Sequence, residues 1–72
     1  MTIAYSRHAR DKMEERGITE QVVQQILDSP DGVAVGETAV IYNAMVNGVE
    51  LRVVVARATD PVLVITVFPV DR

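Results

Sequence analysis

The dipeptide Asn47-Gly48 constrains the fold of this chain more than any other feature of its sequence. Asn-Gly is a preferred pair for a two-residue β-hairpin turn, because both turn residues must adopt a positive φ. Apolar and β-branched residues on either side predict two strands, over residues 38–46 and 49–57. A two-residue turn also fixes the register of the two strands, and therefore decides which side chains share a face.

That register divides the hairpin into two unlike faces. One face is almost wholly apolar and should lie against the helices: Val40, Tyr42, Ala44, Val46, Val49, Leu51, Val53 and Val55. The other face is mixed: Ile41, Asn43, Met45, Glu50, Arg52 and Val54. Apolar residues on a second face favour a covered surface, so we expect a homodimer or a complex that buries Ile41, Met45 and Val54.

The remaining segments complete a single α+β domain over residues 1–72. Residues 62–68 are apolar nearly throughout and predict a central strand, after a turn at residues 58–61. Residues 2–5 predict a short edge strand, and residues 33–35 are either an extra strand or an extended lead-in. The predicted order is β-α-α-β-β-β, with two helices packed on one face of a twisted antiparallel sheet.

Both helices have clear boundaries. Ser6 is a good N-cap for the first helix, and Gly17 can adopt the left-handed conformation that ends it. Thr19 should cap a second helix over residues 20–28, whose apolar stripe is Val22, Val23, Ile26 and Leu27. The first helix has only Ala9 and Met13 on its apolar face, so it should be mostly in water.

The first helix also carries the candidate chemistry. His8, the only histidine, would occupy the second helical position, where the positive end of the helix favours the neutral ring that can accept a proton. A neutral histidine beside arginines suits cleavage of a phosphodiester, with the ring moving the 2′-hydroxyl proton. The alternative is an exposed histidine that only helps to cap the helix.

Five further residues are candidates for the same site. Arg52, in the middle of a strand, either holds an anion or pairs with a neighbouring side chain, and Thr66 is either a site residue or a β-branched filler. Arg10, Lys12 and Arg16 are the candidate substrate-binding cations. For Arg16 the favoured alternative is structural, with its charge complementing the helix dipole at the C-terminus.

Composition excludes several other functions. With no cysteine and one histidine, the chain predicts no zinc site, and we expect neither a metal nor another cofactor. No apolar run reaches the roughly 20 residues of a membrane helix and no secretory signal is visible, so a cytoplasmic protein is expected. The net charge of −3 disfavours general nucleic-acid binding, but residues 19–50 hold no Lys or Arg while the first helix is rich in both.

The motifs resemble a known family. A Ser-x-His-Ala opening from Ser6, then Glu-Arg-Gly-Ile from Glu15, and later residues 51–55 and 64–69 look like the signature of the domain of unknown function 4258 family. Lys12-Met13 stands where Arg-Met is usual in that family. The family is similar in topology to the RelE and ParE bacterial toxins, although this chain is acidic and lacks the C-terminal Tyr or His that many RelE-like ribonucleases use.

The resemblance implies a fold shared with small ribonucleases, and His8, Arg16, Arg52 and Thr66 as functional positions. The leading hypothesis is a metal-independent endoribonuclease of a toxin–antitoxin system, which would bind RNA and an antitoxin protein. The rival hypothesis is a non-catalytic protein-interaction module on the same fold.

Overall fold

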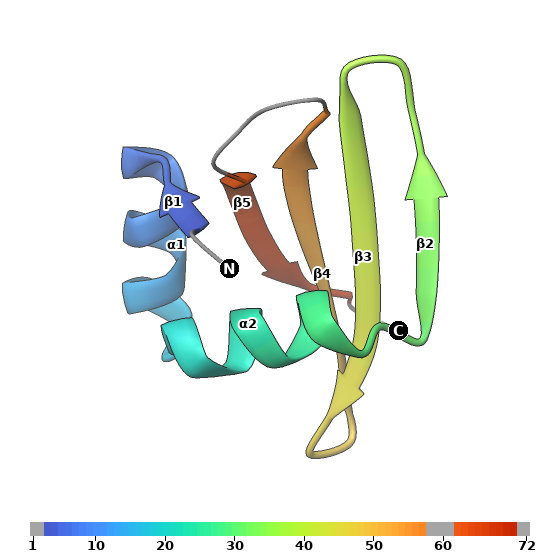
Figure 1. Cartoon of the computed structure of the whole chain (residues 1–72). Helices are drawn as coiled ribbons and strands as arrows, with labels where there is room; N and C mark the ends of the chain where they lie inside the picture. The colour runs from blue at the N-terminus through green and yellow to red at the C-terminus, as the bar shows by residue number, and fades with distance from the viewer. Residues whose placement is uncertain (1–2, 58–61, 71–72) are drawn as a thin grey trace.

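A short strand and two helices lead into a meander of four strands (Figure 1). The computed structural model describes residues 3–57 and 62–70, so the predicted turn at 58–61 lies outside the described residues. The elements are β1 (Ile3–Tyr5), α1 (Arg7–Arg16), α2 (Glu20–Asp28), β2 (Gly32–Val35), β3 (Ala39–Val46), β4 (Val49–Ala56) and β5 (Val62–Pro69). The α+β class is therefore confirmed, and residues 33–35 belong to a true strand.

The described strands form one five-stranded sheet in the order β1-β5-β4-β3-β2. The prediction of an antiparallel sheet is wrong at one edge, because β1 pairs parallel to β5 while the other neighbours are antiparallel. The reason is the direct connection from β1 to α1 through Ser6. The helix continues alongside β5 in the direction of that strand, so the short strand before it has the same polarity.

The Asn47-Gly48 hairpin has the predicted register. Val46 lies opposite Val49, and the ladder continues to Ala39 opposite Ala56. Asn47 and Gly48 have φ angles of 51° and 82°, which is the left-handed geometry that this dipeptide tolerates.

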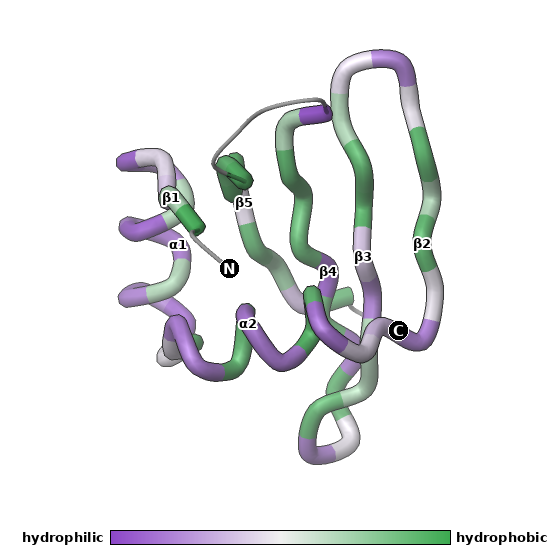
Figure 2. Tube along the Cα trace, in the orientation of Figure 1, coloured by the Kyte–Doolittle hydropathy of each residue, from purple (hydrophilic) through white to green (hydrophobic). Residues whose placement is uncertain are grey.

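The core lies between the helices and the predicted apolar face of the sheet. Each helix contributes two buried residues, and the strands contribute the rest: Ala9, Met13, Val23, Ile26, Ala44, Leu51, Val53, Val55, Val64 and Val67. Figure 2 shows the same division along the chain, with a mostly hydrophilic α1 and mostly hydrophobic central strands. Both helices thus cover one face of the sheet, and we call the opposite side the outer face.

A bulge in β5 sets which of its residues reach the outer face. Val53 lies opposite Val67 and Val55 opposite Val64, so the register shifts between Val54 and Val55. The shift allows both Val64 and Val67 to be fully buried beneath the helices. As predicted, β5 lies inside the sheet, between β1 and β4.

Both helix starts are capped as the sequence predicted. The Ser6 hydroxyl accepts a hydrogen bond from the Ala9 amide at 3.0 Å, and Thr19 accepts from Val22 at 3.2 Å. Gly17 ends α1 with a φ of 67°. Ser6 has a second role that the sequence did not reveal, because its hydroxyl also donates to the Ile65 carbonyl at 2.8 Å.

This double role predicts that Ser6→Ala is more damaging than an ordinary cap deletion. We expect a loss of about 2 kcal/mol of unfolding free energy, because the variant loses a cap and leaves the Ile65 carbonyl without its hydroxyl donor. Thr19→Ala is the matched control and should cost about 1 kcal/mol. Urea unfolding followed by circular dichroism measures both, and equal losses would show that the bond to Ile65 contributes nothing.

Candidate functional site

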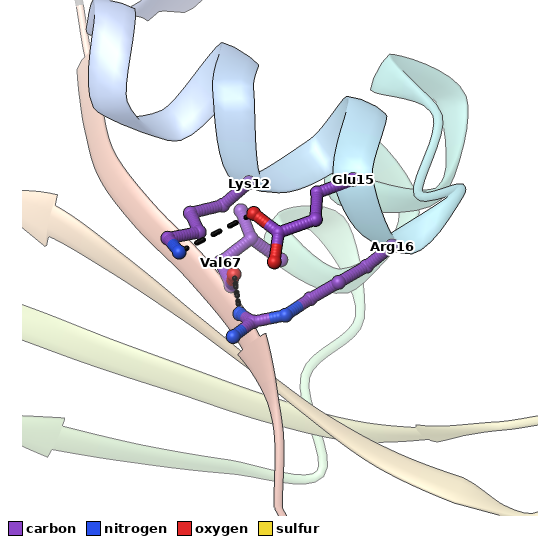
Figure 3. Close-up of polar contacts among 4 residues, drawn as sticks. All are labelled: Lys12, Glu15, Arg16 and Val67. Carbon is purple, nitrogen blue, oxygen red and sulfur yellow. Dashed lines mark hydrogen bonds and ion pairs between the residues drawn. The ribbon is translucent and has the colours of Figure 1, made fainter.

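The strand β1 pairs only with the first residues of β5, Val62 to Val64. Along the rest of that edge of β5, α1 takes the place of a neighbouring strand. The main chain of Ser6 donates to the Val64 carbonyl at 2.9 Å, and its hydroxyl bonds to Ile65. At the other end of the helix, Nη1 of Arg16 donates to the Val67 carbonyl at 2.9 Å (Figure 3). These contacts fix α1 alongside β5 and supply donors to an edge that would otherwise be open.

Three of the predicted site residues form a row on one flank of α1. His8, Lys12 and Arg16 are spaced four apart, so they lie on the same side of the helix, about 6 Å along its axis from one to the next. Figure 3 shows Lys12 and Arg16 both extending toward β5. We call His8, Lys12 and Arg16 the α1 row.

The members of the α1 row differ in how they are held. His8 is exposed, and no hydrogen bond or ion pair joins it to another residue of the described segments. Lys12 is 32% exposed and pairs with Glu15 at 3.4 Å, a surface contact that solvent weakens. Arg16 is held by its bond to Val67. The row therefore presents one imidazole and two cations to solvent along the β5 edge.

Arg10, the remaining predicted substrate-binding cation, does not belong to the α1 row. Its Nη1 pairs with Oε1 of Glu20 at 3.2 Å, and its guanidinium lies 5.2 Å from the centre of the Tyr5 ring. Burial raises the pKa of Tyr5, and Glu20 raises it further while Arg10 lowers it. Arg10 thus links β1, α1 and the start of α2 on the other flank of the helix.

Arg52 and Thr66 lie on the outer face, on neighbouring strands. The register places Arg52 opposite Phe68 and Thr66 opposite Val54. Nε of Arg52 donates to Oε2 of Glu50 at 3.2 Å, so the strand arginine has a carboxylate partner. The Arg52 side chain is still 45% exposed.

The α1 row and the outer face adjoin at one end of β5. Arg16 bonds to Val67, whose neighbours Thr66 and Phe68 both point to the outer face. Arg16 also borders an open hollow of about 580 Å³ that extends to the β3–β4 hairpin, lined by Arg16, Met45, Gly48, Val49, Glu50, Pro69 and Val70. His8 lies two turns away at the start of the row, and no described contact joins it to Arg52.

The sequence did not identify Phe68 or the hollow. The position of Phe68 opposite Arg52 depends on the β5 bulge, which no local pattern indicates. The row itself could have been found, because residues four apart on a capped helix share a face.

The described segments contain no cluster of three or more His, Cys, Asp or Glu side chains that could hold a metal ion. None of their helices combines the length and the apolar character needed to cross a membrane.

Comparison with known proteins gives one family. A family model described as "Domain of unknown function (DUF4258)" matches residues 5–69, which include both helices and the hairpin. No curated protein and no solved structure matched the chain.

Proposed function

The chain belongs to the family described as a domain of unknown function (DUF4258), and from its geometry we propose that it binds and cleaves single-stranded RNA without a metal ion. The observation that carries the proposal is the α1 row. It sets the only histidine of the chain in line with Lys12 and Arg16 along one solvent-facing flank of α1. A proton acceptor in line with cations is the minimum that cleavage of a phosphodiester next to a 2′-hydroxyl needs.

The proposed reaction is an internal transesterification. The His8 ring accepts the 2′-hydroxyl proton while the 2′-oxygen forms a bond to phosphorus. The bond from phosphorus to the 5′-oxygen breaks, and that oxygen takes a proton from water. The hydroxide so formed takes the proton from the His8 ring, which returns to its starting form. The products are a 2′,3′-cyclic phosphate and a 5′-hydroxyl end.

Lys12 and Arg16 would stabilise the charge that develops on the phosphate. Both can donate to the non-bridging oxygens, and the guanidinium of Arg16 is already oriented by its bond to Val67. The exposed pair of Lys12 with Glu15 is weak enough to exchange for a phosphate contact.

The outer face would hold the adjoining part of the strand. Phe68 is half-buried beside Arg52, and an aromatic ring next to a cation is a common platform for a nucleobase and its phosphate. Thr66 offers a hydroxyl on the same face. The net charge of −3 confines binding to this local surface. Two phosphate contacts predict a salt slope of only about −1.4 for a single strand.

The test is cleavage of a single-stranded RNA by the purified full chain in the presence of a chelator. We expect products with 2′,3′-cyclic phosphate ends, and no cleavage where the 2′-hydroxyl of the scissile nucleotide is replaced by hydrogen. Intact RNA after prolonged incubation, or cleavage of the deoxy-substituted strand, would contradict the proposed reaction. In a toxin–antitoxin system an antitoxin protein would inhibit this activity.

The second candidate function is protein binding through the outer face, with a second copy of the chain as partner. Among the described segments, no helix or strand covers this face, and Met45 on it is 51% exposed. Ile41 and Val54 lie opposite each other on the same face, with the Asn43–Arg52 pair between them and Met45.

Burial of this apolar group predicts a homodimer that Met45→Glu weakens, because the new carboxylate would lose its water at the interface. Light scattering over a range of concentrations measures the effect, with Gln24→Glu on the exposed side of α2 as a control for added charge. A monomer at every concentration, with intact folding, would contradict this second candidate.

A further inference from the structure

The strand β2 forms an open edge of the sheet. It pairs only with β3, and no described element lies beyond it in Figure 1. The opposite side of the sheet is different. There α1 lies along the part of β5 that β1 does not pair with, and Ser6 and Arg16 donate hydrogen bonds to it. The described chain therefore protects one side of its sheet and leaves β2 unprotected.

The register shows which backbone groups β2 presents. The Gly36 amide donates to the Ala39 carbonyl at 2.8 Å. In an antiparallel ladder every second residue bonds to the partner strand, so the N–H and C=O groups of Ala34 also point toward β3. The N–H and C=O groups of Val33 and Val35 consequently point to the free edge. The β3–β4 ladder gives the same assignment. Its turn makes Val46 and Val49 a hydrogen-bonded pair, and the alternation from that pair directs the Ile41 N–H and C=O groups toward β2.

The side chains of this edge are apolar and solvent-exposed. Val33 is 51% exposed and Val35 is 66% exposed. Charged residues, prolines and bulges are the usual features that prevent an edge strand from pairing with another strand. Residues 32–36 contain none of them. The edge thus combines free backbone groups with an apolar surface suited to another strand.

The charges around β2 are mostly negative. Asp28 and Asp31 precede the strand and Glu37 follows it, and all three are exposed. No Lys or Arg occurs between residues 19 and 50. Arg57 reaches the far end of the strand, where its Nη1 donates to the Gly36 carbonyl at 2.9 Å and offsets Glu37. At the other end of the strand, Oδ2 of Asp31 accepts a hydrogen bond from the Met45 amide at 2.9 Å, and no cation within residues 19–50 offsets its charge.

We propose that β2 binds an extended segment of another protein as an added antiparallel strand with basic flanks. Its backbone would exchange hydrogen bonds with Val33 and Val35, and its own β-branched side chains would cover these two valines. A Lys or Arg beyond the apolar part would lie near Asp31 and be attracted by its negative charge. This is recognition by strand addition, in which main-chain bonds give affinity and alternate side chains give specificity. The proposal does not depend on RNA cleavage.

A second copy of the chain fits this edge poorly. The two-fold pairing that uses both Val33 and Val35 is centred on Ala34. It would set Asp31 of each copy opposite Glu37 of the other. Like charges directly opposite on paired strands are destabilising, so the acidic flanks favour a basic partner over self-association.

The test is titration of the isotope-labelled full chain with a short peptide that has Lys at both ends, alternating Thr and Val between them, and blocked termini. We expect chemical-shift changes and slowed hydrogen exchange at the Val33 and Val35 amides. A peptide with Glu in place of both Lys should bind about tenfold more weakly or worse, because its ends repel the acidic flanks. Added salt should weaken binding of the Lys peptide.

Two variants locate the binding surface. Val35→Lys puts a charge on the exposed edge and should abolish binding, whereas Gln21→Lys adds the same charge at the start of α2 and should leave affinity unchanged. Unperturbed Val33 and Val35 amides at millimolar peptide would overturn the proposal. So would equal affinity for the Glu peptide, or a dimer of the free chain that already protects these amides.

Discussion

His8→Ala is expected to lower the rate of RNA cleavage by about 10²–10⁴-fold, the usual contribution of a general acid–base group. The loss would fall on the chemical step, because the variant keeps Lys12 and Arg16 and should bind RNA nearly as well. His8 is exposed, so its replacement should change the free energy of unfolding by no more than about 0.5 kcal/mol.

Arg7→Ala is the matched control for this experiment. Arg7 is the exposed neighbour of His8 on α1 but lies outside the α1 row, so its loss removes a cation without touching the proposed chemistry. Single-turnover cleavage and RNA binding measured separately distinguish the two variants. If His8→Ala and Arg7→Ala cleave equally fast, the ring does not carry the proton and the α1 row is not a catalytic site.

Ile26→Ala should have the largest effect on stability. Ile26 is 1% exposed and sits in the core between α2 and the sheet, so truncation leaves a cavity that costs about 2–5 kcal/mol. A core of this size rarely provides more than about 3–5 kcal/mol of net stability. The variant should therefore be largely unfolded at physiological temperature.

Leu27→Ala provides the comparison within the same helix. Leucine and isoleucine lose the same number of heavy atoms, but Leu27 is only partly buried against the core. Its truncation should cost clearly less. Urea unfolding of both variants gives the difference in midpoint, and equal midpoints would show that α2 does not pack as the structure has it.

The α1 row shows how far local sequence can define a candidate site. Ser6, Gly17 and the four-residue spacing of His8, Lys12 and Arg16 all lie within one helix, so the capping and periodicity rules were sufficient to place them. The structure adds that Arg10, on the other flank of the helix, is paired with Glu20. The action of the α1 row on RNA is a prediction, which the cleavage assays of His8→Ala and Arg7→Ala test.

The sequence by itself determined the hairpin register, both helices and their caps, and the face of the hairpin that forms the core. These features depend on neighbouring residues, where the Asn47-Gly48 turn and the spacing of apolar side chains leave few alternatives. Only the tertiary structure decided the parallel pairing of β1 with β5, the bulge that sets Phe68 opposite Arg52, and the exposed edge of β2. The bond from Ser6 to Ile65 spans 59 residues of sequence, and contacts at such distances depend on how the whole chain packs rather than on any local pattern.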